Sequence, residues 1–527
     1  MSICFVSNFC FLFLFLYVVA SDTRRFWQVT DFHHDPNYTT VGDPGNVDNR
    51  RMCHRTADYR SNSSAGRFGN YLCDAPWSLV EAAVEGMKEI EPNPDFILWT
   101  GDDPPHVPVP TLSSPKVLDI IRNITGLIRR HFPDTRVFPV LGNHDYYPKG
   151  QMPPDNQNDP IYEAIANMWV GDQWIGSSET ESFDTFRRGG FYESTYEPPN
   201  GGQTLRMVGL NTVYYYHQDL LTKDVEDPAG QLEWLTSVFG DAQEKGQKVY
   251  LFGHVPPGMF ERKRNTNWFY LDFNVVLTQF IIDSSDVIAG QFFAHQHSDS
   301  FKLFYGVNDD GKGSGVIGVP AGVMYLAPSV TPWKTTLNGV SANNPSIRLY
   351  EYDATTGAVV NIQQYYMNLT EANVDGTAKW ELEYSATAAY GLHNVNSSSI
   401  GSLVESFLTN QSLFNMYYEY NSVSYADEPC DDDCKTTQIC SIMCPLYDQY
   451  ASCLNDPQNA RQLCSLRVTQ SGPSDFPVYA DVLIGVGAGL IICVFVFVLL
   501  WKEGRQRRKM IFRVDSKEPL LSPTDPD

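Results

Sequence analysis

Five short apolar runs constrain the fold of this 527-residue chain more than any other feature. Each has the length and β-rich composition of a buried strand, and each leads directly into a polar cluster that contains glycine or histidine. The runs are residues 26–30, 96–100, 137–141, 248–252 and 287–293. Helical patterns at 77–90 and 117–131 lie between them, and Asp74, Ala75 and Pro76 precede the first as a cap and a proline at the first helical position. Such alternation predicts an α/β domain with its reactive groups on loops at the strand ends.

The polar clusters at the ends of the five runs contain side chains that can bind metal. In chain order they read Asp31-Phe32-His33, Gly101-Asp102, Gly142-Asn143-His144-Asp145, Gly253-His254 and His295-Gln296-His297. Oxygen and imidazole ligands suit two divalent ions a few Å apart, provided that one carboxylate is shared between them. Residues i and i+2 of a strand share a face, so the Asp-x-His and His-x-His spacings can direct both side chains to one side.

The order of these clusters resembles that of the calcineurin-like metallophosphoesterases. The resemblance implies two metal sites: one ion bound by Asp31, His33 and His297, the other by Asn143, His254 and His295, and Asp102 bridging both. A hydroxide held between the ions would attack phosphorus in line. The tyrosine ligand of the related purple acid phosphatases is replaced by Pro105, three residues after the bridging aspartate. We therefore expect two zinc ions, with other divalent metals possible.

Three further residues are candidates for the acid–base chemistry. By the same resemblance, His144 would protonate or hydrogen-bond the leaving group, and Asp145 would orient the His144 imidazole. His106 lies four residues beyond Asp102. It could contact the leaving group or the phosphate, or it could be a structural histidine behind the metal ligands.

The residues around the metal motifs are more specific than the motifs. Four segments resemble the acid sphingomyelinase branch, most of all its acid sphingomyelinase-like phosphodiesterases. They are WTGDDPPHVP at 99–108, GNHD at 142–145, GLNT at 209–212 and GHVPPG at 253–258. The resemblance spans about residues 27–464 and implies a four-layer αββα sandwich, a small disulfide-rich helical C-terminal region and zinc-dependent phosphodiesterase activity.

The short segment between the predicted signal peptide and Asp31 bears on the substrate class. Only about ten residues separate Asp31 from the predicted signal peptide, which leaves no room for the saposin-like lipid-binding domain of acid sphingomyelinase itself. We therefore expect hydrolysis of nucleotide-type or other soluble phosphodiesters. The alternatives are a sphingomyelin or phospholipid phosphodiesterase, a polyphosphatase, and a catalytically inert membrane receptor.

Two apolar segments predict the topology. Residues 1–20 indicate a signal peptide, with a signal anchor as the alternative because no basic residue precedes the apolar stretch. Residues 482–501 are long enough to cross a bilayer, and a basic cluster follows them. A glycolipid anchor is a less fitting alternative, since such signals end in the apolar tail. We expect a type I membrane protein with an extracellular or lysosomal/endosomal luminal catalytic domain.

The expected domains are a signal peptide (1–20), a metallophosphoesterase catalytic domain (21–395) and a helical disulfide-rich region (396–468), then a stalk (469–481), a transmembrane helix (482–501) and a cytosolic tail (502–527). Eight cysteines fall outside the two apolar segments, and an even number in an oxidising compartment predicts four disulfides. They are Cys53, Cys73, Cys430, Cys434, Cys440, Cys444, Cys453 and Cys464. We expect Cys53 to pair with Cys73, while the other six leave fifteen pairings open.

The sequence also predicts modification of the surface, and its net charge excludes one class of partner. Six sequons predict N-glycosylation, at Asn37, Asn62, Asn123, Asn368, Asn396 and Asn410. The net charge of −24 argues against a nucleic-acid duplex as partner. The partners we expect are a small phosphodiester or nucleotide substrate and the membrane, through one C-terminal helix, with the protein itself a monomer.

Overall fold

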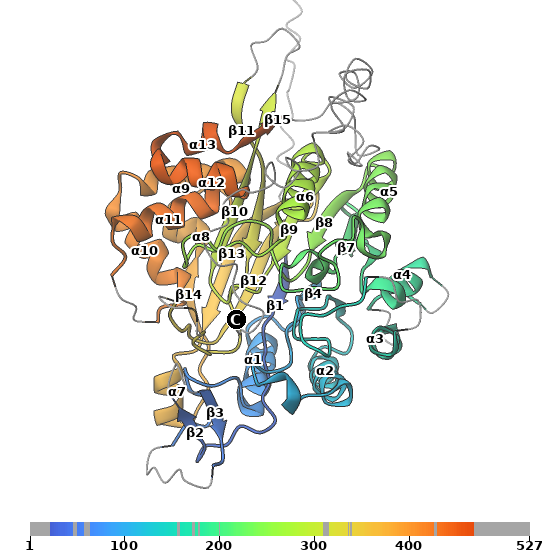
Figure 1. Ribbon diagram of the computed structural model, residues 1–527, viewed down its shortest axis with the longest axis vertical. Helices are drawn as coiled ribbons and strands as arrows, with labels where there is room; N and C mark the ends of the chain where they lie inside the picture. Colours follow the sequence, from blue (N-terminus) through green and yellow to red (C-terminus); the bar gives the residue numbers. More distant parts are fainter. Residues whose placement is uncertain are drawn as a thin grey trace, which may run out of the picture.

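The computed structural model describes residues 22–467 except 46–49, 57–63, 155–158, 171–173, 178–179, 200, 309–315, 336, 338–339 and 426–428 (Figure 1). The predicted signal peptide, stalk, transmembrane helix and cytosolic tail lie outside the described residues, as does Asn62. Among the helices of the described part, none combines the length and the apolar character that a bilayer span requires.

A six-stranded mixed sheet carries the first three metal motifs. Its strand order is β14-β13-β12-β1-β4-β5, and β1, β4 and β5 run parallel to one another. The carboxyl ends of these three strands therefore meet at one edge of the sheet. The strands are β1 (Thr23–Val29), β4 (Phe96–Trp99), β5 (Arg136–Pro139), β12 (Ser346–Asp353), β13 (Val359–Tyr366) and β14 (Glu381–Ser385).

A seven-stranded mixed sheet carries the other two motifs. Its order is β15-β10-β11-β9-β8-β7-β6, with β7, β8 and β9 parallel. The motifs that contain His254 and His295 follow β8 and β9. The strands are β6 (Tyr192–Tyr196), β7 (Leu205–Gly209), β8 (Lys248–Phe252), β9 (Ile288–Phe293), β10 (Ser300–Asn308), β11 (Val316–Leu326) and β15 (Ser465–Arg467).

The two sheets face each other across a core rich in aromatic rings. Phe26 of β1 stacks on Tyr350 of its own sheet, with ring centroids 5.0 Å apart. It also contacts the second sheet, at 5.7 Å from Tyr250 and 5.3 Å from Phe292. Burying such large rings between the sheets supplies much of the hydrophobic stabilisation and fixes the sheets relative to each other. The expected α/β fold is thus present as two mixed sheets.

Helices pack against both sheets. Helix α1 (Trp77–Ile90) packs against α2 (Ser114–His131) and β12, while α5 (Gln231–Glu244) lies on β8 and α6 (Leu271–Asp283) on β10 and β11. The smaller elements are α3 (Pro160–Val170), α4 (Glu181–Gly189), α7 (Leu369–Asp375), α8 (Ala386–Tyr390), the hairpin β2 (Asp43–Gly45) and β3 (Arg50–His54), and the 3-10 turns η1 (Val109–Thr111), η2 (Thr212–Tyr215), η3 (Pro228–Gly230) and η4 (Pro457–Asn459).

The start of α1 differs from the prediction although its bounds agree with it. Pro76 is the extended residue before the helix, not its first helical residue, and the helix has no side-chain cap. Asp74 does not cap it either, because its carboxylate accepts hydrogen bonds from His106. Helix α2 begins three residues before the predicted 117, since Pro115 fits the first helical turn.

The C-terminal region forms a helical lobe beside β10 and β11, in orange in Figure 1. It contains α9 (Ser397–Phe407), α10 (Gln411–Asn421), α11 (Asp432–Met443), α12 (Tyr447–Asn455) and α13 (Ala460–Leu463). Three disulfides link its cysteines as Cys430–Cys434, Cys440–Cys453 and Cys444–Cys464, and the fourth joins Cys53 to Cys73. Strand β15 then leaves the lobe and pairs parallel with β10, so the chain returns to the catalytic sheet.

Five predicted glycosylation sites fall on described residues. Asn37, Asn123, Asn396 and Asn410 are exposed, and Asn368 is half-buried. Asn368, Asn396 and Asn410 also cap α7, α9 and α10, and in each the side-chain oxygen accepts a backbone N–H. Glycan attachment uses the amide nitrogen, so capping and modification are compatible at these positions.

Candidate metal centre and active site

The loops after β1, β4, β5, β8 and β9 bring all seven predicted metal ligands to one edge of the paired sheets. Six of these side chains are buried, and His297 is partly exposed. Buried ionisable groups are costly unless they are paired or bind a cation. The predicted ligands are Asp31, His33, Asp102, Asn143, His254, His295 and His297.

One cluster consists of Asp31, His33 and His297. The Asp31 Oδ1 atom lies 3.2 Å from His297 Nε2 and 3.6 Å from His33 Nε2, and these two nitrogens are 3.2 Å apart. Thr30 donates its hydroxyl to the other oxygen, Asp31 Oδ2, at 2.7 Å. Asp31 Oδ1 is buried and accepts no hydrogen bond from the described residues. A cation at this point would satisfy the oxygen and both nitrogens together.

The second cluster consists of Asp102, His254 and His295. Asp102 Oδ2 lies 3.0 Å from His254 Nε2 and also 3.5 Å from His33 Nε2, which belongs to the first cluster. Asn143 lies on the neighbouring loop, where the next residue, His144, donates its backbone N–H to Asp102 Oδ1 at 2.7 Å. Asp102 is therefore the carboxylate that stands between the two clusters.

Backbone carbonyls set the imidazole orientations. His33 Nδ1 lies 2.8 Å from the Pro104 carbonyl, and His254 Nδ1 lies 2.7 Å from the Thr100 carbonyl. A ring that donates Nδ1–H to a carbonyl presents the Nε2 lone pair on its opposite side. Both Nε2 atoms face the carboxylates, which is the orientation that metal binding needs.

The backbone is strained at five of the seven predicted ligands. Asp31, His33, Asp102, His295 and His297 all have positive φ, between 42° and 70°, although none is glycine. Such conformations are uncommon for residues with side chains and gather at functional sites. The Asp31 N–H donates to Gly101 O at 2.8 Å, and the His33 N–H donates to Asp102 O at 3.0 Å. These bonds join the first two loops and hold the ligands in place.

The electrostatics of the two clusters also favour a cation. Burial alone would raise the pKa of Asp31, but His254 and His297 hold that pKa well below its usual value. Burial would lower the pKa of His254, yet Asp102 and Asp31 raise it to about 9. The carboxylates are therefore ionised and attract positive charge, whether as protons on the imidazoles or as metal ions that displace them.

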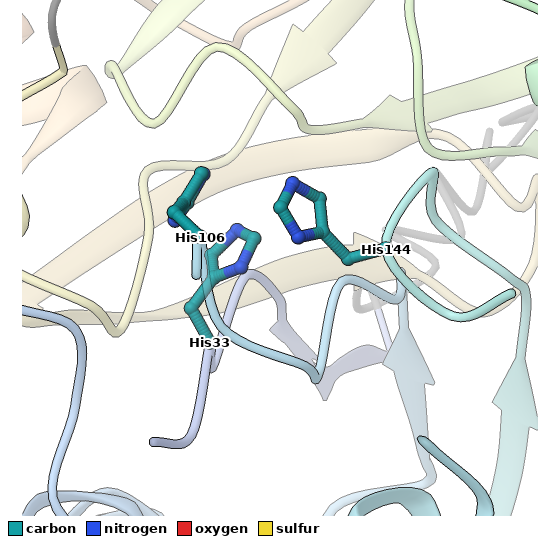
Figure 2. A group of neighbouring side chains, drawn as sticks. All are labelled: His33, His106 and His144. Atoms are coloured by element: carbon teal, nitrogen blue, oxygen red, sulfur yellow. The ribbon is translucent and has the colours of Figure 1, made fainter. Parts of the chain in front are cut away.

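Beside the first cluster, the rings of His33, His106 and His144 converge (Figure 2). The centroid of His106 lies 4.0 Å from that of His33 and 4.5 Å from that of His144. Asp74 accepts from the His106 backbone N–H at 2.5 Å and lies 2.9 Å from His106 Nδ1. Trp333 stacks on the His106 ring at 3.8 Å. His106 is thus fixed from two sides and faces the other histidines.

The structure gives Asp145 a role other than the expected one. Its carboxylate accepts backbone N–H groups from Asp102 at 2.8 Å, Asp103 at 2.9 Å and Gly142 at 2.7 Å. His144 Nδ1 instead faces the Pro105 carbonyl at 3.3 Å. Asp145 therefore braces the loop after β4 against the loop after β5 and does not orient His144. Beside the metal clusters, Asp74 and His106 form an acid–histidine pair, and sequence reasoning missed Asp74 by interpreting it as a helix cap.

A cavity opens onto these groups. Its lining includes Asp102, His106, His295 and His297, together with Phe260, Arg262, Trp268, Trp333 and Asn343. Three consecutive tyrosines, Tyr214, Tyr215 and Tyr216, are fully buried, and none of them lines the cavity. Tyr216 supports it from behind, with its ring 5.1 Å from that of His295.

Known protein families match this fold and site. Residues 24–299 match the calcineurin-like phosphoesterase family, and residues 319–460 match the acid sphingomyelin phosphodiesterase C-terminal region. Two sheets whose strand ends carry clustered histidines and aspartates define a metallophosphoesterase.

Similar proteins show which family of metallophosphoesterases this is. The human acid sphingomyelinase-like phosphodiesterase 3b is 44% identical over 82% of this chain and 90% of its own length. The human cyclic GMP-AMP phosphodiesterase SMPDL3A is 39% identical over 82% of this chain and 90% of its own. Sphingomyelinase phosphodiesterase C of Dictyostelium discoideum is 36% identical over 82% and 92%. The chain belongs to the acid sphingomyelinase-like phosphodiesterases and is a phosphodiesterase of that family.

Proposed function

We propose that this protein hydrolyses nucleotide-type phosphodiesters at a centre of two zinc ions, in a luminal or extracellular domain of a type I membrane protein. The observation that carries the proposal is the position of Asp102 Oδ2, within 3.5 Å of an imidazole nitrogen from each cluster. The donor set of carboxylates, imidazoles and one amide suits zinc. The four disulfides support a compartment of the secretory pathway.

The residues divide between two tasks. Asp31, His33 and His297 would hold one ion, Asn143, His254 and His295 the other, and Asp102 both. When bound, the ions supply an activated water and neutralise charge on the phosphoryl oxygens. The protein contributes the fixed positions of the ligands, because the strained loops and the Nδ1 hydrogen bonds hold the side chains before the substrate arrives.

His106 and His144 face the leaving-group side in this proposal. Burial lowers the pKa of both rings well below the usual histidine value. An anionic phosphate beside them favours their protonated forms, in which Nε2 becomes a hydrogen-bond donor. Either ring can then donate to the departing oxygen, and Asp74 keeps the His106 ring oriented for this.

The substrate class rests on the cavity and on the relatives. The cavity lining includes Phe260, Trp268 and Trp333, which give it an aromatic wall beside the predicted metal ligands. One relative is named as a cyclic GMP-AMP phosphodiesterase. Sphingomyelin is the second candidate, favoured by the name of the Dictyostelium relative.

The test is hydrolysis by the full-length protein, purified in detergent, of bis-p-nitrophenyl phosphate, ATP, cyclic GMP-AMP and sphingomyelin micelles. Each substrate is assayed at pH 5 and pH 7, with and without a chelator, and with zinc restored. Chelator-sensitive cleavage of the nucleotides with sphingomyelin untouched supports the proposal. A preference for sphingomyelin would favour the second candidate, and activity that survives complete metal removal would overturn both.

A further inference from the structure

The cavity beside the metal centre contains a cation that the proposed chemistry has not used. Arg262 follows β8 on the loop that contains His254, and it lines the cavity together with His295 and His297. Among the described residues of the cavity wall, Arg262 is the sole lysine or arginine. Phe260 and Trp268, whose ring centroids are 5.1 Å apart, also line the cavity, so it combines this cation with aromatic side chains and predicted metal ligands.

Asn421, the last residue of α10, holds the Arg262 side chain. Arg262 Nε donates to Asn421 Oδ1 at 2.9 Å, and Nη2 donates to the Asn421 carbonyl oxygen. Asn421 is 1% exposed, and its Nδ2 donates to Asp299 O at 2.9 Å. Asp299 comes two residues after His297, so one asparagine of the helical lobe fixes Arg262 relative to the metal loop. A cation fixed in this way loses little conformational entropy when it binds an anion.

The neighbouring acid is engaged in the protein interior. Glu261 accepts from Ser298 Oγ at 2.5 Å and from Asn421 Nδ2 at 3.2 Å. The ammonium group of Lys302, fully buried, lies 3.8 Å from the Glu261 carboxylate. Lys302 therefore balances the charge of Glu261 in the core.

We propose that Arg262 binds a second phosphate group of the substrate, next to the one that the metal centre cleaves. This inference rests on the proposed nucleotide phosphodiesterase function and deepens it. A guanidinium group matches a phosphate in shape and charge. The protein would thereby select substrates with two phosphates, either adjacent as in ATP or separated as in a cyclic dinucleotide. A phosphocholine headgroup carries a quaternary ammonium instead, which a fixed arginine repels.

The experiment compares Arg262→Gln with Arg264→Gln in the full-length protein. Arg264 lies on the same loop and has the same charge, but it is exposed, lies 3.7 Å from Asp433 and does not line the cavity. For Arg262→Gln we expect kcat/KM to fall about ten- to hundredfold for ATP or cyclic GMP-AMP, the loss of one charge-assisted contact. For bis-p-nitrophenyl phosphate, which has one phosphate, we expect a change of less than about threefold. Arg264→Gln should match the wild type on every substrate.

The two nucleotide substrates show which arrangement of phosphates Arg262 accepts. If Arg262→Gln loses activity with ATP alone, Arg262 binds a phosphate adjacent to the one that is cleaved. If the variant loses activity with cyclic GMP-AMP alone, Arg262 binds a separated phosphate. An equal loss on all substrates, or no loss on any, would overturn the inference. Arg262→Lys, which keeps the charge without the planar fork, should fall between the wild type and Arg262→Gln.

A failure of the proposed function is recognised separately. If the wild type cleaves bis-p-nitrophenyl phosphate but neither nucleotide, the nucleotide function is wrong. Arg262 is then tested by competitive inhibition of bis-p-nitrophenyl phosphate cleavage by ADP and by AMP. We expect ADP to inhibit the wild type more strongly than AMP, and Arg262→Gln to abolish the difference. Equal inhibition of the wild type by the two nucleotides, or a difference that persists in the variant, would refute the role of Arg262.

Discussion

Asp102 is the residue that connects the two clusters of predicted metal ligands. It lies between His33 and His254, and its other oxygen accepts the backbone N–H of His144. His144 itself lies beside the clusters, with its ring turned toward His106. The two residues are adjacent in space, yet the proposed mechanism gives them separable tasks, one in holding cations and the other in contacting the substrate.

Replacing each of these residues in turn separates the two tasks. Asp102→Asn should remove most bound metal and most activity, because the amide cannot supply the bridging charge. His144→Ala should retain nearly all of the metal while kcat on bis-p-nitrophenyl phosphate falls about 10²- to 10⁴-fold. Elemental analysis of the purified variants, together with kcat, checks both statements. Equal metal loss in the two variants would show that His144 is a ligand.

Asp74→Asn tests the carboxylate that sequence reasoning missed. Asp74 bonds His106 through both of its oxygens, and the neutral amide cannot hold the ring and the backbone equally well. We expect kcat to fall about ten- to hundredfold with the metal content unchanged. Asp119→Asn, which alters an exposed carboxylate on α2, serves as the control. Unchanged kcat in Asp74→Asn would mean that His106 needs no carboxylate partner.

Among individual residues, the sequence identifies groups whose chemistry is local and misses those whose partners are distant. The metal motifs are short, and each follows a strand, so their convergence could be predicted from strand pairing. Asp74 lies 32 positions from His106, and Asn421 lies 159 positions from Arg262. Neither pairing leaves a local pattern. Asp145 was misinterpreted because adjacency in sequence suggested a contact that the tight loop does not make.

At the scale of elements, the helical lobe depends on disulfides that differ in their surroundings. Cys440 and Cys453 join α11 to α12 and are fully buried. Cys430 and Cys434 are half-buried and close a short loop at the start of α11. The constraint on the unfolded chain grows with the length of the closed loop, and 13 residues separate the first pair against 4 in the second.

Removing each disulfide should therefore have unequal effects. Cys440→Ser with Cys453→Ser should lower the free energy of unfolding by about 3 kcal/mol, plus the cost of burying two hydroxyl groups. Cys430→Ser with Cys434→Ser should cost about 2 kcal/mol or less. Urea denaturation followed by tryptophan fluorescence measures both. A larger loss for the Cys430 pair would contradict the dependence on burial and loop length.

Helices and strands were predicted correctly where the hydrophobic periodicity was strong, and the predictions were less accurate at the ends of these elements. The bounds of α1 and β8 agree with the sequence, whereas β1 extends from 23 to 29 and not from 26 to 30. The additional residues Thr23, Arg24 and Arg25 are polar, and they are strand because β12 pairs with them along their whole length. Such pairing is tertiary information that a local pattern does not contain.

For the whole molecule, we expect the free energy of unfolding to be larger at acidic pH than at neutral pH. Burial raises the pKa of Asp219 to about 7, against an ordinary value of 3.8. Between these values the unfolded chain releases a proton that the folded chain keeps. Stability from this group is therefore greatest at the acid end and is lost as pH rises from about 4 to about 7.

Thermal unfolding of the full-length protein at pH 5 and pH 7.5 checks this expectation. We expect the wild type to have the higher Tm at pH 5, and Asp219→Asn to reduce the difference, because the amide does not titrate. Asp119→Asn should leave the difference as in the wild type, since its carboxylate is exposed. The same pH difference in Asp219→Asn and the wild type would assign the dependence to other groups.

Strand β15 has a mechanical consequence. After all five helices of the lobe, the chain pairs with β10 and so ends its described part on the edge of the catalytic sheet. Tension applied to the chain beyond residue 467 would act first on the parallel pairing of residues 465–467 with 305–307, in shear along the strand. The load would reach the sheet that carries His295 and His297 before it reached the helices. A tether at this end therefore holds the enzyme by its active-site scaffold, and the lobe between bears little of the pull.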